Sequence, residues 1–290
     1  MKYLFGTLIL ILVLLVITVF QIPDNNLYII ACDVGQGDAI LVTYKNIQIL
    51  TDGGPDNKVI SCLGKHIPFY DREIELIIST HPDSDHSTGL VDVLKNYKVD
   101  NIFINPIDSG TQTIKALENL VGSQGVHVIT PIEGMQLGVG LIHLDIFNPN
   151  QDLFNGLTDK VEGDKLGFYK PKESTNIYSI VYRLNFINFK GLFPGDIASI
   201  DSDRLASENL IGNVNYIKVP HHGSNDGLTD NLLKAIMPKV AVISVGKKNL
   251  FGHPTQKILD MLNIYNVKTY RTDEMGDVEI VTNGREFWVK

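Results

Sequence analysis

The sequence predicts an α/β (α+β) protein of four layers, αββα, that follows an N-terminal transmembrane anchor helix. Hydrophobic residues make up 44% of the 290 residues, which is enough for a large core. Short apolar runs alternate with helical patterns in two halves of the chain, and a polar, glycine-rich stretch at 150–174 joins them. Two such halves favour a sandwich of two sheets over a single doubly wound sheet.

The anchor is predicted from residues 1–23. No residue between Tyr3 and Pro23 is charged, and twenty helical residues span about 30 Å, the thickness of a hydrocarbon core. Lys2 precedes this run and Asp24 follows it, so the positive-inside rule places the N-terminus in the cytoplasm and the rest outside. The run lacks a small-residue cleavage site, which favours an uncleaved, single-pass signal anchor over secretion after cleavage. A lipoprotein-like box ends at Cys32, but cleavage there would remove the first strand, so Cys32 is predicted to be a core residue.

The predicted domain covers residues 27–290. Runs of four to eight residues rich in β-branched side chains predict strands, and longer runs with helical spacing predict helices. The predicted strands are 27–32, 39–44, 47–50, 73–79, 101–105, 126–130, 141–147, 177–184, 189–193, 216–219, 240–245, 267–270 and 278–281. The predicted helices are 88–97, 111–121, 199–210, 229–237 and 255–265, and 150–174 is predicted to be an exposed connection.

Charge and cysteine content exclude several classes of protein. The 25 Lys and Arg residues against 33 Asp and Glu residues give a net charge of −8, which excludes a basic surface that coats nucleic acid. An enzyme that meets phosphodiesters only at a metal remains open. The two cysteines, with no Cys-x-x-Cys motif, exclude a disulfide scaffold and a structural zinc ribbon.

Five of the eight histidines lie in three short motifs, each after a predicted strand. The first motif follows the strand at 73–79 and reads His81-Pro-Asp83-Ser-Asp85-His86. Four metal-competent side chains within six residues exceed the needs of one ion, so the motif predicts a two-metal site. The alternative is a polar turn that caps a helix, which rarely carries this combination.

The other motifs carry one or two candidate residues each. Asp196 ends the apolar strand at 189–193, and alone it would be interpreted as a turn residue. His221 and His222 follow the strand at 216–219; neighbouring residues of a strand point to opposite sides, so one of them is expected to bind metal, and His221 is preferred. His253 precedes a helix, where a surface or capping histidine is the alternative.

Taken together, these motifs resemble the metallo-β-lactamase superfamily, and within it the metallo-β-lactamase-like domain of ComEC-type DNA-uptake (competence) proteins. The resemblance covers residues 27 to the end. It rests on the motifs at 33–38 (Asp-Val-Gly-Gln-Gly-Asp), 51–54 (Thr-Asp-Gly-Gly), 80–86, 193–196, 218–224, 241–246, 252–254 and 271–273.

The resemblance implies two divalent metal ions that share a bridging carboxylate. The ligands of one site would be His81, Asp83 and Asp196; those of the other would be Asp85, His86, His221 and Asp196. Asp85 and His253 would also act in catalysis. The residues implied to support the ligands or contact substrate are Asp52, His222, Ser224, Asn176, Lys218 and Asn249. For Asp52, the resemblance implies a buried carboxylate that orients the ligand loop, and the alternative is a simple turn residue. The 33–38 turn is interpreted as mainly structural, with contact to substrate as the alternative.

Two departures from the family pattern affect the expected metal. Asp83 replaces the second histidine of the signature, and Asn176 lies in the stretch where a further histidine is usual before the bridging carboxylate. His127 and His143 fall too early in the chain to replace it. The site is therefore richer in oxygen ligands, which makes Mn²⁺ a competitor of Zn²⁺.

The leading functional prediction is a membrane-tethered hydrolase of phosphodiesters, with DNA as substrate, outside the cell membrane. Two metals about 3.5–4 Å apart would supply a bound hydroxide. One hydrophobic span cannot form a channel, which argues against a competence role for this chain alone; a separate channel protein is the partner that such a role would need. The alternatives are a hydrolase of lactones or lactams and a non-catalytic domain that binds partners through its metal site.

Overall fold

The computed structural model describes residues 5–7, 9, 11, 24–155, 157–161 and 166–290. The predicted anchor at 1–23 lies mainly outside the described residues. Within the described part of the chain, no helix has both the length and the apolar character needed to cross a membrane. The first strand begins at Leu27, and the last strand ends at Val289.

The first sheet has eight strands in the order β15-β14-β1-β2-β3-β4-β5-β6. Their bounds are β1 Leu27–Ala31, β2 Ile40–Tyr44, β3 Ile47–Thr51, β4 Glu73–Ser79, β5 Lys98–Ile104, β6 His127–Ile129, β14 Val278–Thr282 and β15 Phe287–Val289. Strands β3 to β6 are parallel, and the others pair antiparallel. The parallel strands β3 and β4 therefore end at the same edge, where polar residues follow both.

The second sheet has seven strands in the order β13-β12-β11-β10-β9-β8-β7. Their bounds are β7 Gln136–Val139, β8 Ile142–Asn148, β9 Val181–Phe186, β10 Phe189–Phe193, β11 Tyr216–Lys218, β12 Val240–Ile243 and β13 Lys268–Arg271. Strands β10 to β13 are parallel. The segments after β10, β11 and β12 thus leave the sheet at one edge, which is where open α/β sheets place ligands.

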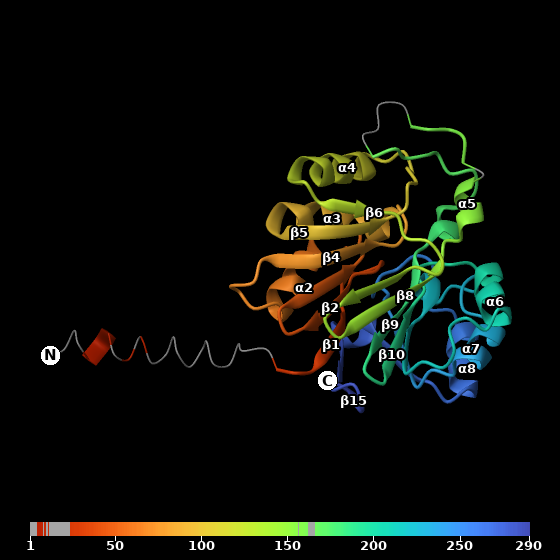
Figure 1. Ribbon diagram of the computed structural model, residues 1–290. Helices are drawn as coiled ribbons and strands as arrows, with labels where there is room; N and C mark the ends of the chain where they lie inside the picture. Colours follow the sequence, from red (N-terminus) through yellow and green to blue (C-terminus); the bar gives the residue numbers. More distant parts are fainter. Residues whose placement is uncertain (1–4, 8, 10, 12–23, 156, 162–165) are drawn as a thin grey trace.

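The helices cover the outer faces of the two sheets, one set on each side of the molecule (Figure 1). Helices α2 Lys58–His66, α3 Ser84–Asn96 and α4 Gln112–Gln124 pack on the first sheet. Helices α6 Ser199–Ser207, α7 Asp230–Ile236 and α8 Gln256–Ile264 pack on the second. A third apolar cluster, which includes Phe103, Tyr182 and Tyr216, fills the space between the sheets. These layers confirm the predicted αββα sandwich.

Short elements complete the fold: helices α5 Gln151–Asn155 and α9 Thr272–Met275, and the 3-10 helices η1 Thr175–Tyr178 and η2 Pro220–Gly223. The prediction that 150–174 is an exposed connection is wrong in part. Phe168 is buried in the core beneath the first sheet, and Leu157 is buried against Tyr178. Apolar residues within this polar stretch therefore contribute to the core.

A disulfide joins Cys32, directly after β1, to Cys62 in α2, with a Cα–Cα distance of 5.9 Å. Both side chains are buried, so the prediction that Cys32 is a core residue is confirmed. The sequence excluded a scaffold of several disulfides, and it held no signal for this single bridge. The pairing depends on the packing of α2 on β1, and helix α2 was not predicted.

Candidate metal centre

The candidate site lies where polar segments leave both sheets. β3 is followed by Asp52, β4 by His81, β10 by Asp196 and β11 by η2 with its two histidines. The facing edges of the two sheets therefore supply side chains to one place, although these residues are far apart in the sequence.

Four of the predicted residues lie close together: Asp85, His86, Asp196 and His222. The Nε2 atoms of His86 and His222 each lie 3.3 Å from Oδ2 of Asp196. Oδ2 of Asp85 lies 3.4 Å from Nε2 of His222 and 4.0 Å from Nε2 of His86. Ligands about 2.0–2.1 Å from one tetrahedral metal ion are about 3.3–3.4 Å apart. Three of these four separations match ligands of one metal ion, and the donor atoms of Asp85, His86 and His222 all lie within 4.8 Å of one another.

The two imidazoles are held with Nε2 facing this cluster. His86 Nδ1 donates to Oδ2 of Asp52 over 2.8 Å, and His222 Nδ1 donates to the carbonyl oxygen of Ser244 over 2.9 Å. Both Nε2 atoms are buried and have no hydrogen-bond partner. A hydrogen bond at Nδ1 that leaves Nε2 free is the arrangement of a metal-binding histidine. This donor set fits a divalent cation.

The charge of the cluster also fits a cation. Asp38, Asp52 and Asp196 are buried carboxylates, Asp85 is one-third exposed, and the one ammonium among them is that of Lys218. Four carboxylates against one ammonium leave an excess of negative charge in a buried place, which is costly unless a cation or protons compensate it.

In the metal-free cluster, the histidines compensate by holding protons. Burial opposes the charge on His222, but the carboxylates of Asp196 and Asp38 outweigh it and raise the pKa of His222 to about 9. The pKa of His86 is raised by Asp196 and Asp52, also against the effect of burial. For Asp196, burial favours the neutral acid, but the charges of His222, His86 and Lys218 hold its pKa well below the ordinary value.

A second, less complete set of donors lies beside the first. His81 packs against His86 with ring centroids 4.1 Å apart, and burial together with the charge of His86 lowers the pKa of His81 to about 4. Nδ1 of His81 lies 3.0 Å from the Thr80 hydroxyl, whose own hydrogen is donated to Asp52. His81 Nδ1 is therefore the donor to Thr80, and Nε2 keeps its lone pair.

Asp83 faces this second set. Its Oδ2 lies 3.7 Å from Nε2 of His81, and its Oδ1 accepts a hydrogen bond of 2.6 Å from the Thr175 hydroxyl. His81 and Asp196 also lie close enough to share an ion with His86. Three donors, one shared with the first position, make this second position the poorer of the two. His127, which contacts Asn101, and His143, on β8, lie outside these clusters.

The structure places His222, not His221, in the cluster. The pair follows a strand, as expected, but it does not alternate as strand residues do: β11 ends at Lys218, and both histidines adopt left-handed backbone conformations with φ of 50° and 54°. This turn directs His222 to Asp85 and Asp196, while His221 Nδ1 donates to the carbonyl oxygen of Asp226 over 2.9 Å. His221 stays at the rim, with its ring centroid 5.9 Å from that of His253.

Lys218 does not stand where a phosphate could reach it. Its side chain is buried, and its ammonium pairs with Asp38 and lies 3.3 Å from Oδ1 of Asp196. Lys218 thus holds the oxygen of Asp196 that faces away from the histidines. Burial opposes the charge, but Asp38 and Asp196 raise the pKa of Lys218.

Asp38 is the residue of this cluster that the sequence analysis did not assign to it. The turn at 33–38 was interpreted as mainly structural, yet Oδ1 of Asp38 lies 3.5 Å from Nδ1 of His222. The turn is also tied to the metal motif: Asp38 N donates to the carbonyl oxygen of Asp85 over 3.2 Å. A carboxylate that closes a glycine-rich turn was the available signal.

The remaining predicted residues lie around the centre. Asp52 accepts hydrogen bonds from both the backbone N–H and the hydroxyl of Thr80, in addition to His86. Asn249 braces the loop of His253: its amide donates to the His253 carbonyl, and the His253 N–H donates to its oxygen. Ser224 and Asn176 are half-buried in the loop after η2 and in η1, respectively, outside the clustered donors.

The fold and this cluster define a metallohydrolase, and the sequence comparison agrees. The model of the metallo-β-lactamase superfamily matches residues 32–247, so the chain belongs to that superfamily. Curated relatives include ComE operon protein 3 of Bacillus subtilis (25% identical over 268 residues) and competence protein ComA of Neisseria gonorrhoeae (24% over 269 residues). These alignments cover 85% and 89% of this chain but 32% and 33% of the relatives, so the chain spans about a third of their length.

Solved structures support the same fold. The metallo-β-lactamase fold protein YhfI from Bacillus subtilis is similar with a TM-score of 0.57 at 10% identity, over 92% of this chain and 100% of that one. CmlA, a diiron β-hydroxylase from Streptomyces venezuelae, has a TM-score of 0.51 at 13% identity, over 86% of this chain and 53% of that one. At these identities, the likeness concerns the fold alone.

Proposed function

We propose that this chain is a metal-dependent phosphodiesterase that cleaves DNA outside the cell membrane. The observation that carries the metal-dependent part is the pair of buried, unpartnered Nε2 atoms of His86 and His222 beside Asp85 and Asp196. A divalent ion there lowers the pKa of water toward about 7 and stabilises negative charge on phosphate oxygens. Zn²⁺ and Mn²⁺ both suit two imidazoles with two carboxylates.

The chain's own residues have distinct roles in this proposal. Asp85 is one-third exposed at the mouth of the site, where it orients the attacking water by accepting its hydrogen bond. His253 is half-buried beside His221; burial and the nearby charges of His222 and His221 lower its pKa, so it is neutral near pH 7. A neutral imidazole at the rim can first accept a proton from the attacking water and then, as the imidazolium, donate it to the leaving oxygen.

A loop beside the centre supports a nucleic-acid substrate. Leu250 and Phe251 are 97% and 70% exposed, and the Phe251 ring stacks near His253 with centroids 5.9 Å apart. Lys247 and Lys248 are exposed in the same loop. Aromatic side chains next to cationic ones are what proteins use to hold bases and phosphates of single strands. The curated relatives are competence proteins, which favours DNA among the phosphodiesters.

The disulfide supports a location outside the cytoplasm, because disulfides persist in oxidising compartments. We therefore infer that residues 1–23 tether the domain at the outer side of the membrane, and that a separate channel protein is a partner. Trapping of thiols tests this: in cells quenched directly into denaturant with an alkylating reagent, which exposes the two buried side chains, Cys32 and Cys62 should resist alkylation until a reductant is added. Alkylation of both without reductant would place the domain in the cytoplasm.

The function is tested with the full chain, stripped of metal and reloaded with Mn²⁺ or Zn²⁺. Cleavage of single-stranded DNA, double-stranded DNA and bis(p-nitrophenyl) phosphate is followed, with Asp196→Ala as control. Metal-dependent DNA cleavage that the control lacks supports the proposal. Cleavage of the small diester alone indicates a phosphodiesterase with another substrate. Two bound metals without turnover of any of the three would overturn the proposal and favour lactones or lactams.

A further inference from the structure

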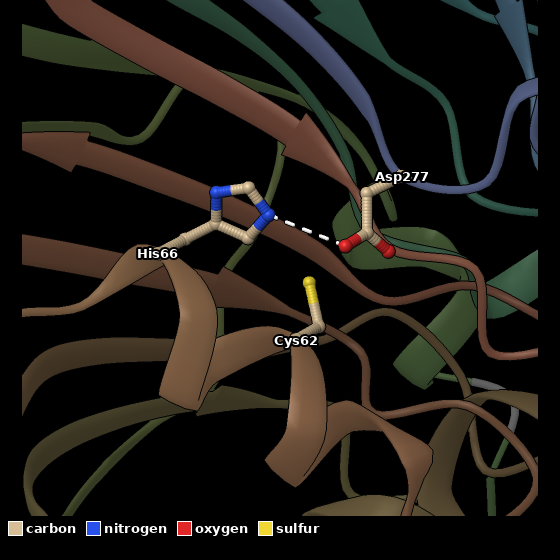
Figure 2. Close-up of side chains that lie close together, drawn as sticks. All are labelled: Cys62, His66 and Asp277. Carbon is tan, nitrogen blue, oxygen red and sulfur yellow. Dashed lines mark hydrogen bonds and ion pairs between the residues drawn. The ribbon is translucent and has the colours of Figure 1, made fainter.

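A second group of metal-competent side chains lies around the disulfide, between α2 and the segment that precedes β14. Cys62 and His66 stand four residues apart on α2 and so share one face of the helix. Asp277, which precedes β14, faces both of them (Figure 2). The Sγ of Cys62, a ring nitrogen of His66 and a carboxylate oxygen of Asp277 all lie within 4.8 Å of one another. Cys32 is bonded to Cys62 at the same place.

The two non-sulfur donors are already positioned as ligands. His66 Nε2 lies 3.3 Å from Oδ2 of Asp277, the separation expected of two ligands of one tetrahedral ion. Oδ1 of Asp277 is held by the backbone N–H of Asp33 over 2.9 Å, which leaves Oδ2 to face the histidine. Nδ1 of His66 lies 3.9 Å from a carboxylate oxygen of Glu279, beyond hydrogen-bond distance.

Lys65 forms an ion pair with Oδ2 of Asp277, but it does not block access of an ion to that oxygen. Its ammonium lies 3.1 Å from Oδ2 of Asp277, but the Lys65 side chain is 61% exposed and can turn into water. The side chains of His66 and Asp277 are 19% and 14% exposed, so a small ion can enter from the surface. Hydrogen bonding by His66 holds the pKa of Asp277 well below its usual range, against the effect of burial, so the carboxylate is ionised.

We propose that Cys32, Cys62, His66 and Asp277 form a tetrahedral zinc site when the Cys32–Cys62 disulfide is reduced. Reduction by a phosphine or a dithiol breaks the S–S bond, and two electrons and two protons yield two thiols. Zinc then binds both sulfurs as thiolates and releases the two protons to water. Two sulfurs, one imidazole and one carboxylate are the donor types of tetrahedral zinc.

The disulfide and the zinc site are mutually exclusive because they use the same sulfur atoms. Either one links the end of β1 to α2: a covalent bond under oxidising conditions and a metal ion under reducing conditions. This link lies at the start of the 33–38 turn, whose last residue, Asp38, belongs to the candidate metal centre. The proposal is independent of the function proposed for that centre.

Cobalt(II) is the probe, since thiolate coordination gives an intense charge-transfer band in the near ultraviolet. The candidate metal centre contains no sulfur and cannot produce this band. The full chain, reduced with a phosphine and freed of it, should develop the band on titration with Co²⁺, and Zn²⁺ should remove it. The oxidised chain should not develop it. His66→Ala and Asp277→Asn should each weaken Co²⁺ binding at this site by more than about tenfold.

Further variants distinguish Co²⁺ bound at the proposed four-ligand site from Co²⁺ bound only by the two cysteine thiols. Cys62→Ser should abolish the band, and each single variant is checked in its oxidised state, where His66→Ala and Asp277→Asn keep the disulfide and the fold. Lys65→Ala should leave the band intact or strengthen binding. A reduced chain without the band, or Co²⁺ affinities of His66→Ala and Asp277→Asn equal to that of the unsubstituted chain, would overturn the proposal.

Discussion

Asp196 stands at the centre of the candidate site, and each of its two oxygens has a different task. Oδ2 lies 3.3 Å from the Nε2 atoms of both His86 and His222, whereas Oδ1 lies 3.3 Å from the buried ammonium of Lys218. The ammonium fixes the carboxylate without occupying the oxygen that faces the histidines. A metal ligand held in this way loses little freedom on binding an ion.

The two adjacent histidines give a matched pair of variants. His222→Ala removes one of four converging donors and should reduce metal affinity by at least about tenfold. His221→Ala removes a rim side chain that bonds a backbone carbonyl, so it should leave metal content unchanged. Metal content after dialysis, measured by mass spectrometry, decides between them. Equal loss in both variants, or a loss in His221→Ala alone, would contradict the assignment of His222.

Metal affinity should rise with pH. In the metal-free protein the pKa of His222 is raised to about 9, so His222 is protonated at neutral pH and must release its proton before Nε2 can bind an ion. Each proton released adds about tenfold in apparent affinity per pH unit below that pKa, and the gain ends above it. Titration calorimetry with Mn²⁺ from about pH 6 to about pH 8, in buffers of different ionisation enthalpy, measures the protons released. An affinity that stays constant over this range would contradict the account.

At the scale of elements, the site depends on close packing between the 33–38 turn and the start of α3. Gly37 has φ of +139°, and a Cβ atom there would lie 2.1 Å from the carbonyl oxygen of Asp85. Only glycine permits this approach. The turn thereby sets the position of Asp38 against the residues of the metal motif.

Gly37→Ala should therefore destabilise the fold by about 1–3 kcal/mol or more and weaken metal binding, since the turn must move away from Asp85. Gly122→Ala is the matched control: Gly122 lies within α4 with no atom near its added Cβ, and the change should stabilise by roughly 0.5–1 kcal/mol. Denaturant unfolding compares the two. Equal unfolding midpoints for Gly37→Ala and the wild type would show that the turn does not need glycine.

The exposed loop at 247–253 should affect the cleavage of a DNA strand but not that of a small diester. Phe251→Ala should raise the KM for single-stranded DNA by roughly fivefold or more, because base stacking contributes about 1–3 kcal/mol. Hydrolysis of bis(p-nitrophenyl) phosphate should not change, because that diester is cleaved at the metal and Phe251 is not among the donors. Phe251→Trp should keep the affinity for DNA. If Phe251→Ala reduced activity on both substrates equally, Phe251 would act by maintaining the conformation of the loop and not by stacking on a base.

The elements themselves were predicted well where their pattern was unambiguous. The bounds of β4 and β10 are those expected from the sequence, since each is a continuous apolar run between polar turns. Residues 177–180 were expected to extend β9, but they lie in and directly after η1. Helix α2 was missed because its short run follows a turn rich in Gly, Pro and Asp. β7 and β15 were missed because an edge strand has little apolar pattern of its own.

The site was predicted in part, for a clear physical reason. Short motifs after strands revealed His81, Asp85, His86 and Asp196, because strand ends position side chains in a known direction. The choice between His221 and His222 depends on backbone angles, which the strand pattern did not contain. The contact of Lys218 with Asp38 joins residues 180 positions apart, and only the packing of the two sheets brings them together.

At the scale of the whole molecule, the two sheets meet across one apolar core and share one metal centre. Strands β3 and β4 bring Asp52, His81, Asp85 and His86, and strands β10 and β11 bring Asp196 and His222. A centre built from both halves forms only when the sandwich is closed. Binding of metal should therefore stabilise the folded state against unfolding.

The disulfide contributes to the same stability from the outer layer. It closes a sequence separation of 30 residues, so its removal should cost about 3–4 kcal/mol. The double variant Cys32→Ser/Cys62→Ser, compared with the oxidised wild type in the presence of a chelator, should unfold at lower denaturant concentration. The chelator removes stabilisation by metal from both proteins. Identical unfolding midpoints for the two proteins would show that the packing of α2 holds this region in place without the disulfide.

Anomalous diffraction from crystals grown with Mn²⁺ tests the central claim most directly, because it locates the ion without relying on activity. We predict a peak bounded by Asp85, His86, Asp196 and His222, with a second, weaker peak beside His81 and Asp83. The absence of a peak among the four, or a peak coordinated by His221 in place of His222, would contradict the account.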